Sequence, residues 1–212
     1  VLRPTELVAA DLDPNIFQVL GSRWVFNLKD TDNGRITKSR LVAQGFSDED
    51  FATVESPTAS HLSVRALCTL AATKGLEISS LDIKQAFLNA NQYESPLCDQ
   101  KRKQLVLKLP KHCSHVFPGC SYVEVPSYRS IYGTRTAPLH WYRTLTSRIL
   151  SLGFTQCQYD NCLFRLYKGD QIVAACAIHV DDIFFVGNDL DSFVRDLNFD
   201  FGSKKRKEFK YC

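Results

Sequence analysis

The segment AIHVDDIFFV, which begins at Ala177, places two adjacent aspartates between two apolar runs. An ordinary buried strand would not carry them, because an unpaired carboxylate taken out of water costs several kcal/mol. The apolar residues 172–178 and 183–186 therefore form the arms of a predicted β-hairpin, with Asp181 and Asp182 at its tip. In that position both carboxylates can leave the apolar layer together and meet water, a basic partner or a metal ion.

A third carboxylate, Asp82, follows a separate short strand predicted at residues 76–81. Hard cations such as Mg²⁺ bind through one or two carboxylates and keep positions open for phosphate oxygens. Three carboxylates converging from two strands could hold a pair of ions about 3.5–4 Å apart, the arrangement used for phosphoryl transfer. Aspartate is also common in turns for its local hydrogen bonds, so the pair at the hairpin tip is by itself a weak indication of a site.

A second hairpin is predicted near the N-terminus, where residues 22–29 and 35–46 alternate in strand fashion around the turn sequence DNG. Residues 91–120 are irregular and polar, apart from a strand-like stretch at 104–110. We interpret this region as a surface insertion.

Two helices are predicted from their end signals and apolar spacing. Ser60 can cap a helix over residues 61–74 that Gly75 ends, with an apolar face made of Leu62, Ala66 and Leu70. A second helix starts at Pro138 and is stopped by Gly153. Its buried face is predicted to consist of Trp141, Leu145, Ile149 and Leu152.

Composition limits the remaining choices only loosely. The 26 basic and 23 acidic residues give a formal net charge of +3, which neither requires nor excludes a nucleic-acid partner. No apolar run approaches the roughly 20 residues that cross a bilayer, and no signal peptide is recognisable, so an intracellular protein without a membrane partner is expected. The eight scattered cysteines are expected to be reduced thiols. The absence of any methionine suggests a piece of a longer product.

Three segments resemble, in order and spacing, motifs of the reverse transcriptase of Ty1/copia-type retrotransposons: LDIKQAFLN at 81–89, SIYGTRTAPLHWY at 130–142 and HVDDIFFVGND at 179–189. RWVFNLK and KSRLVAQGF resemble the fingers region of the same family. The resemblance implies an α/β (α+β) right-hand polymerase whose antiparallel palm sheet packs on helices. Residues 1–212 would form a single reverse transcriptase fragment, with fingers at about 22–75 and part of 91–140, palm at about 76–90 and 141–200, and the start of the thumb at 201–212.

The resemblance also implies an activity, RNA-directed DNA polymerisation by two-metal nucleotidyl transfer of a deoxynucleotide onto a primer 3′-hydroxyl. Asp82, Asp181 and Asp182 would be the catalytic residues and would bind two Mg²⁺ ions, or Mn²⁺ in their place. Asp181 is expected to dominate within the adjacent pair.

Further residues match substrate-binding positions of the family. Phe87 would lie under the deoxyribose and select DNA precursors, although an apolar Phe is also a common core residue. The remaining positions are Tyr132 and Gly133 on the nucleotide and template side, Arg135 toward phosphate or template, and Lys38 and Arg40 toward the triphosphate. The basic residues 204–207 could grip the template–primer backbone, or could be a charged chain end.

The sequence departs from the family at His179, where the residue two before the first paired aspartate is normally Tyr. The stretch Thr134-Arg135-Thr136 also stands where Leu-Lys-Gln is common. One alternative is therefore a catalytically inactive, decayed retrotransposon remnant that at most binds nucleic acid. Another is a metal-dependent phosphohydrolase that uses the same carboxylates.

The expected partners are an RNA or DNA template with its primer, deoxynucleoside triphosphates, and the rest of a Pol polyprotein with thumb, RNase H and integrase. For an active element, we expect localisation in a cytoplasmic virus-like particle.

Overall fold

The computed structural model describes residues 2–5, 9–31, 34–47, 56–90, 103–111, 113, 115–126, 129–200 and 203–209. The chain forms two compact units, each built on one β-sheet. Unit 1 consists of Val1–Val54 and Ala90–His140, and unit 2 of Glu55–Asn89 and Trp141–Cys212. The predicted mixed α/β fold, with an antiparallel sheet packed on helices, is confirmed.

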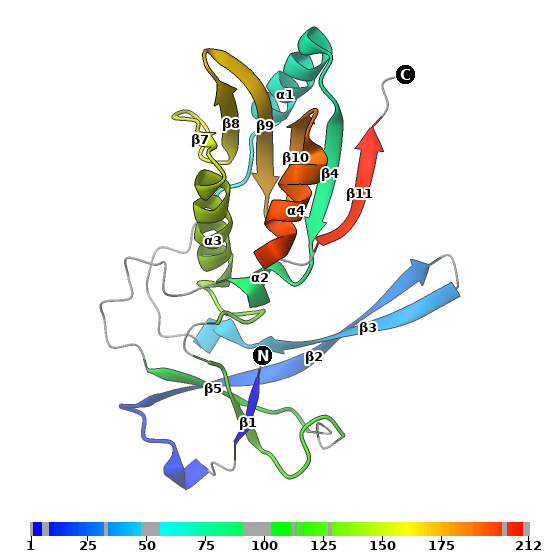
Figure 1. The fold of residues 1–212 in the computed structure, drawn as a ribbon. Coiled ribbons are helices and arrows are strands. Elements are labelled where there is room, and N and C mark those ends of the chain that lie inside the picture. Colours follow the sequence, from blue (N-terminus) through cyan, green and yellow to red (C-terminus); the bar gives the residue numbers. More distant parts are fainter. Residues whose placement is uncertain are drawn as a thin grey trace. The chain divides into compact units, whose positions relative to one another are not determined.

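Unit 1 contains a five-stranded sheet in the order β1-β6-β5-β2-β3. Figure 1 labels its strands β1, β2, β3 and β5. Its strands are β1 (Arg3–Thr5), β2 (Phe17–Thr31), β3 (Gly34–Ala43), β5 (Gln104–Lys108) and β6 (Tyr122–Glu124). Two 3₁₀ turns, η1 (Ala9–Asp11) and η2 (Gly45–Ser47), precede β2 and follow β3. β2 and β3 form the predicted N-terminal hairpin, with residues 32–33 of its turn outside the described residues.

Strand β5 corrects the interpretation of residues 91–120 as a surface insertion. It runs parallel to β2 and antiparallel to β6, so it lies inside the sheet. Val106 and Leu107 are fully buried, together with Leu20 and Val123 from the neighbouring strands. The three apolar residues at the centre of QLVLK indicated the strand, but the polar sequence around them masked its burial. Residues 91–102 lie outside the described residues.

Unit 2 contains a six-stranded, antiparallel sheet in the order β11-β4-β10-β9-β8-β7 (Figure 1). Its strands are β4 (Ile78–Ile83), β7 (Thr155–Gln156), β8 (Leu163–Lys168), β9 (Gln171–His179), β10 (Asp182–Gly187) and β11 (Ser203–Phe209). The helices of the chain are α1 (His61–Lys74), α2 (Ala86–Asn89), α3 (Ala137–Ser151) and α4 (Leu190–Asp200). All belong to unit 2 except the first residues of α3.

Helix α1 has the predicted ends but a different buried face. The Ser60 side chain accepts a hydrogen bond from the Ser63 N–H, and Gly75 ends the helix in the left-handed conformation. The predicted apolar face was wrong for Leu62, which is 76% exposed, and for exposed Ala66, whereas Leu70 packs against the core as predicted. The buried residues are instead Ser63, Leu67 and Ala71, and the last two pack on the sheet at Ile78, Ala175, Ala177 and Val186. Small residues on both sides allow this close contact.

Helix α3 buries the predicted residues Trp141, Leu145 and Ile149, and Gly153 with φ of 89° follows its end. Helix α4 packs beside it. The Phe193 ring of α4 stacks on Phe185 of β10 with a centroid separation of 4.6 Å. This aromatic contact attaches α4 to the sheet.

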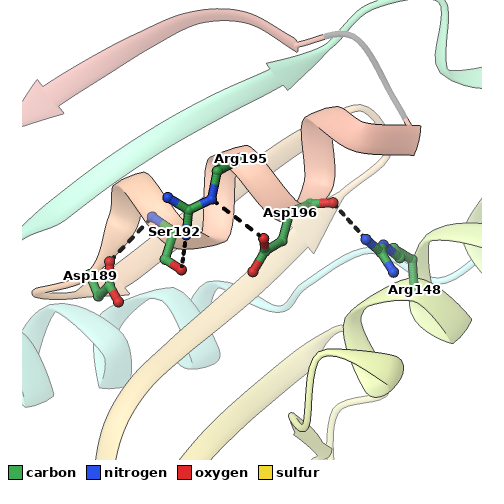
Figure 2. Close-up of polar contacts among 5 residues, drawn as sticks. All are labelled: Arg148, Asp189, Ser192, Arg195 and Asp196. Carbon is green, nitrogen blue, oxygen red and sulfur yellow. Dashed lines mark hydrogen bonds and ion pairs between the residues drawn. The ribbon is translucent and has the colours of Figure 1, made fainter.

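Polar contacts at α4 add to this packing (Figure 2). Asp189 accepts a hydrogen bond from the Ser192 N–H at 3.2 Å and caps the helix. Arg148 of α3 donates to the carbonyl oxygen of Asp196 at 2.7 Å, which links the two helices. Arg195 contacts Ser192 and Asp196, but the Arg195 side chain is largely exposed and that of Asp196 partly exposed, so their ion pair adds little stability.

The cysteine prediction is consistent with the described part of the chain. Six described cysteines are free thiols: Cys68, Cys113, Cys120, Cys157, Cys162 and Cys176. Burial raises the pKa of the Cys162 thiol to about 12, and the charge of Asp160 adds to the shift. A thiol with so high a pKa is protonated and unreactive at neutral pH.

Candidate active site

The β9–β10 hairpin places the two adjacent aspartates at the end of the unit 2 sheet. Val180 and Asp181 form its turn, and Asp182 is the first residue of β10. β10 pairs with β4 so that Asp182 lies directly opposite Asp82. Across β9, its partner is His179. Residues opposite one another in adjacent strands project from the same face of a sheet, so Asp82, His179 and Asp182 share one face.

The structure thus brings the three predicted carboxylates to one end of one sheet. Asp182, rather than Asp181, is the direct partner of Asp82. Asp181 is held through its backbone instead, because its carbonyl oxygen accepts a hydrogen bond from the Ile83 N–H at 2.9 Å. Ile83 immediately follows Asp82, so this bond joins the two acidic segments.

The charges of the three aspartates act on one another. Partial burial raises the pKa of Asp182, and the nearby Asp181 and Asp82 carboxylates raise it further. His179 acts in the opposite direction and lowers it. A raised carboxyl pKa means that the site opposes a further negative charge, and a bound cation would relieve that repulsion.

The donor set suits a hard cation such as Mg²⁺, which prefers carboxylate oxygens. Within the described residues, no three or more His, Cys, Asp or Glu side chains are gathered in a group that could hold a metal ion. The three aspartates thus have the oxygen ligands that Mg²⁺ prefers, but their side chains are not gathered around one metal position in this structure.

Two non-glycine residues near this end of the sheet have a positive φ. Val180 in the hairpin turn has φ of 58°, and Gln85, just after β4, has φ of 54°. The turn at Gln85 leads into the short helix α2, on which Phe87 is half-buried. The predicted sugar-contacting residue is therefore attached to the strand that carries Asp82, one turn beyond its end.

Trp141 is a candidate functional residue that the sequence prediction assigned only to the core. Its side chain is 1% exposed, and its indole N–H donates to the Val180 carbonyl oxygen at 2.7 Å. The available signal was the position of this tryptophan within the motif-like segment 130–142. Periodicity alone indicates a core residue there.

Unit 1 holds the other predicted site residues. Arg40 of β3 lies over the Tyr132 ring, 6.0 Å from its centroid, and the Tyr132 carbonyl accepts a hydrogen bond from the Ala43 N–H at 2.8 Å. Gly133 has φ of 93°, and a Cβ there would lie 2.1 Å from the Ala43 carbonyl oxygen. The structure thus brings Arg40, Tyr132 and Gly133 together.

The remaining predicted basic residues lie on β3, in the segment before α3 and on β11. Lys38 is on β3 two residues before Arg40, and Arg135 is exposed in the segment before α3. The basic residues 204–207 belong to β11, whose backbone pairs with β4, so this segment continues the sheet of unit 2.

Comparison with known proteins identifies the class. A sequence model described as reverse transcriptase (RNA-dependent DNA polymerase) matches residues 8–211. The chain belongs to this reverse transcriptase family.

The individual relatives are retrotransposon polyproteins. The chain is 29% identical over 211 residues to the retrovirus-related Pol polyprotein from transposon RE1 of Arabidopsis thaliana, covering 93% of this chain and 13% of that protein. It is 26% identical over 186 residues to the transposon Ty1-GR3 Gag-Pol polyprotein of Saccharomyces cerevisiae, covering 86% of this chain and 9% of that protein. The predicted resemblance to Ty1/copia-type elements is confirmed.

Among solved structures, the apo telomerase of Candida tropicalis truncated from its C-terminal domain aligns with a TM-score of 0.41 and 11% identity. The alignment covers 89% of this chain and 50% of that chain. A TM-score this low does not establish a shared fold.

Within the described residues, no helix combines the length and apolarity needed to cross a membrane.

Proposed function

We propose that this chain is the polymerising part of a Ty1/copia-type Pol polyprotein and acts as an RNA-directed DNA polymerase. The observation that carries the proposal is the placement of Asp82 opposite Asp182, with Asp181 adjacent, in a chain of the reverse transcriptase family. Such a cluster of carboxylates suits the transfer of a nucleotidyl group to a primer 3′-hydroxyl.

In this proposal, unit 2 is the palm and unit 1 the fingers. The division differs from the predicted boundaries at two elements, since α1 (His61–Lys74) and β11 (Ser203–Phe209) both belong to unit 2. Helix α1 was expected with the fingers, yet it packs on the sheet that carries the aspartates. Strand β11 was expected to begin the thumb, yet it extends that same sheet.

Asp82, Asp181 and Asp182 would hold two Mg²⁺ ions, or Mn²⁺ in their place. When bound, these ions would supply Lewis-acid activation of the primer hydroxyl and neutralise charge on the triphosphate. The chain's own part is to keep three carboxylates at one sheet end despite their repulsion. Burial raises the pKa of Asp182, and the repulsion from Asp181 and Asp82 raises it further.

The remaining site residues would bind the substrates. Phe87 would exclude the 2′-hydroxyl of a ribonucleotide, while Lys38 and Arg40 would bind the triphosphate. Tyr132, Gly133 and Arg135 would contact the nucleotide and template, and the stacking of Arg40 on Tyr132 supports a joint role for these two side chains. The expected partners are template–primer, deoxynucleoside triphosphates, and the thumb, RNase H and integrase parts of a longer polyprotein, within a cytoplasmic virus-like particle.

His179 favours a second candidate function, that of an inactive remnant which at most binds nucleic acid. The family normally has Tyr at this position, and here an imidazole lies opposite Asp182 across β9 and β10. An imidazole in place of the family's phenol ring changes the chemistry of the sheet face on which Asp82 and Asp182 lie.

Three parallel assays separate the candidates, each on the chain within its full natural polypeptide and on its Asp82→Asn variant. A polymerase extends a primer on an RNA template in the presence of Mg²⁺, and the substitution abolishes extension. A remnant binds template–primer equally well with either residue and extends nothing. A phosphohydrolase releases phosphate without any primer. Asp170→Asn, an exposed change in the β8–β9 turn, is the matched control and should behave like the unaltered protein.

A further inference from the structure

The tip of the β9–β10 hairpin is bound to helix α3 by a buried hydrogen-bond donor. The Trp141 indole N–H donates to the Val180 carbonyl oxygen at 2.7 Å, and the Trp141 side chain is almost completely buried. A buried indole N–H needs an acceptor, and here the acceptor is the peptide group that links Val180 to Asp181.

The conformation of Val180 gives this contact its significance. Its φ of 58° lies in the left-handed region, which a β-branched residue rarely adopts. Such a conformation persists only where the surrounding structure holds it in place. The bond from Trp141 acts on the carbonyl of this same residue, so it is the contact best placed to hold the strained turn.

The next peptide group is also held. The Asp181 carbonyl oxygen accepts from the Ile83 N–H at 2.9 Å. Two consecutive carbonyls are therefore bound by two different elements, the first by α3 and the second by the end of β4. Together these bonds fix the peptide planes on both sides of the Asp181 Cα, and hence the direction in which its side chain leaves the backbone.

We propose that Trp141 is a positioning residue of this site: it holds Val180 in the left-handed conformation and thereby orients Asp181. The inference rests on the proposed nucleotidyl transfer for its catalytic consequence, whereas its structural part is independent of it. Metal-dependent transfer is sensitive to sub-ångström placement of ligands, so releasing the tip lowers turnover more than it weakens substrate binding.

The test replaces the donor and leaves the packing nearly intact. Trp141→Phe keeps an aromatic ring and lacks the N–H, and 3-benzothienylalanine at position 141 keeps the full bicyclic shape with sulfur in place of the N–H. Ile149→Val removes core volume from the same helix without touching a donor, and serves as the control. Two readouts are needed, amide hydrogen exchange in the 212-residue chain and single-nucleotide addition in the full natural polypeptide.

The expected result is selective. Exchange at the Ile83 amide rises by about tenfold or more in both Trp141 variants, while amides in the centre of β9 keep their protection. The catalytic rate constant falls by about tenfold or more with little change in KM for the nucleotide. Ile149→Val changes exchange across the sheet evenly, if at all.

A further substitution tests the mechanism. Glycine adopts a φ near 58° without steric cost, so Val180→Gly should reduce the loss caused by Trp141→Phe when the two are combined. An unchanged Ile83 amide in the 3-benzothienylalanine protein, or exchange that rises equally throughout the sheet, would overturn the positioning role. Failure of the unaltered protein to add nucleotides would instead contradict the proposed function, and the exchange result would still decide the role of Trp141.

Discussion

Asp182 of β10 lies directly opposite Asp82 of β4, in the register that runs from this pair to Val186 opposite Ile78. Carboxylates facing each other across adjacent strands repel. The raised pKa of Asp182 reflects its burial, the adjacent Asp181 carboxylate and this repulsion from Asp82. The pair is unfavourable for folding unless a cation joins it.

Replacing Asp182 by Asn is therefore expected to stabilise the metal-free chain. The gain should be about 0.5 kcal/mol in the free energy of unfolding, since the group is largely exposed and solvent screens the repulsion. Because the folded-state pKa is raised, the gain should be absent below the ordinary carboxyl pKa near 3.8 and should grow as pH rises through the folded-state pKa. Urea unfolding of both proteins between pH 3 and pH 7 measures it.

With Mg²⁺ present, the unaltered chain should become more stable than Asp182→Asn, the reverse of their order without metal. Added Mg²⁺ is expected to raise the unfolding temperature of the unaltered chain more than that of Asp182→Asn, because binding to the folded state alone stabilises it. After chelation of the metal, Asp182→Asn should again be the more stable of the two proteins. Equal shifts in the two proteins would show that Asp182 does not bind the ion.

Asp160 ties helix α1 to the start of β8, and its loss should destabilise unit 2. Its carboxylate accepts hydrogen bonds from the Ser63 hydroxyl, from the Ser60 N–H at 3.0 Å and from the Cys162 N–H at 2.8 Å. Burial alone would raise the pKa of Asp160, but these hydrogen bonds outweigh it and lower the pKa. Asp160→Asn exchanges one accepting oxygen for a donor and should cost about 1–2 kcal/mol at neutral pH.

The stability lost in Asp160→Asn and the stability gained in Asp182→Asn both depend on pH, but they arise from pKa shifts of opposite sign. The lowered folded-state pKa means that the contribution of Asp160 is complete above the ordinary value of 3.8 and disappears as pH falls through the folded-state pKa. The stability difference between the unaltered chain and Asp160→Asn should therefore shrink in acid. Asp170→Asn is the control, and a pH-independent difference would contradict the assigned hydrogen bonds.

Gly133 should not tolerate a side chain. A Cβ at this position would lie 2.1 Å from the Ala43 carbonyl oxygen and 2.6 Å from Val42 Cγ1, and its φ is 93°. Gly133→Ala should destabilise unit 1 by about 3 kcal/mol or more, through backbone strain and overpacking together. Gly119→Ala carries the strain of a positive φ, at 73°, but meets no atom within 4 Å, so it should cost only about 1 kcal/mol. Thermal unfolding of both variants provides the comparison.

Phe87 should control the choice of sugar. Replacing its ring by the smaller Ala is expected to raise the incorporation of ribonucleotides relative to deoxyribonucleotides by about tenfold or more, because the steric exclusion of the 2′-hydroxyl is lost. Phe184→Leu is a matched control, since this half-buried ring packs instead against the core beneath α1. Unaltered sugar selection in Phe87→Ala would assign Phe87 to the core.

Much of this fold follows from local sequence signals. The cap Ser60, the stop Gly75 and the DNG turn each act within a few residues, so they predict α1 and the β2–β3 hairpin correctly. The buried face of α1 was mispredicted because Ser63 and Ala71 are less apolar than the exposed Leu62. Which face is buried depends on the sheet that α1 meets, and that contact is not encoded within the helix.

In the candidate site, too, local sequence predicts some features, whereas contacts between distant segments determine others. The chemistry of Asp82, Asp181 and Asp182 could be predicted from residue types and motif order. The direct pairing of Asp82 with Asp182, and the bond from Trp141 to Val180, could not, because both depend on strand register and on packing between distant segments. The burial of β5 was missed for the same reason, as its partners are far away in the sequence.

The most direct test of the central claim is single-nucleotide addition to a primer on an RNA template with Mg²⁺, using the full natural polypeptide and its Asp181→Asn variant. Asp170→Asn controls for loss of a negative charge elsewhere, and circular dichroism and template–primer binding verify folding. We predict addition by the unaltered protein and by Asp170→Asn, and none by Asp181→Asn. Equal addition by all three proteins, or none by the folded and template-bound unaltered protein, would contradict the assignment of this carboxylate cluster as a working polymerase site.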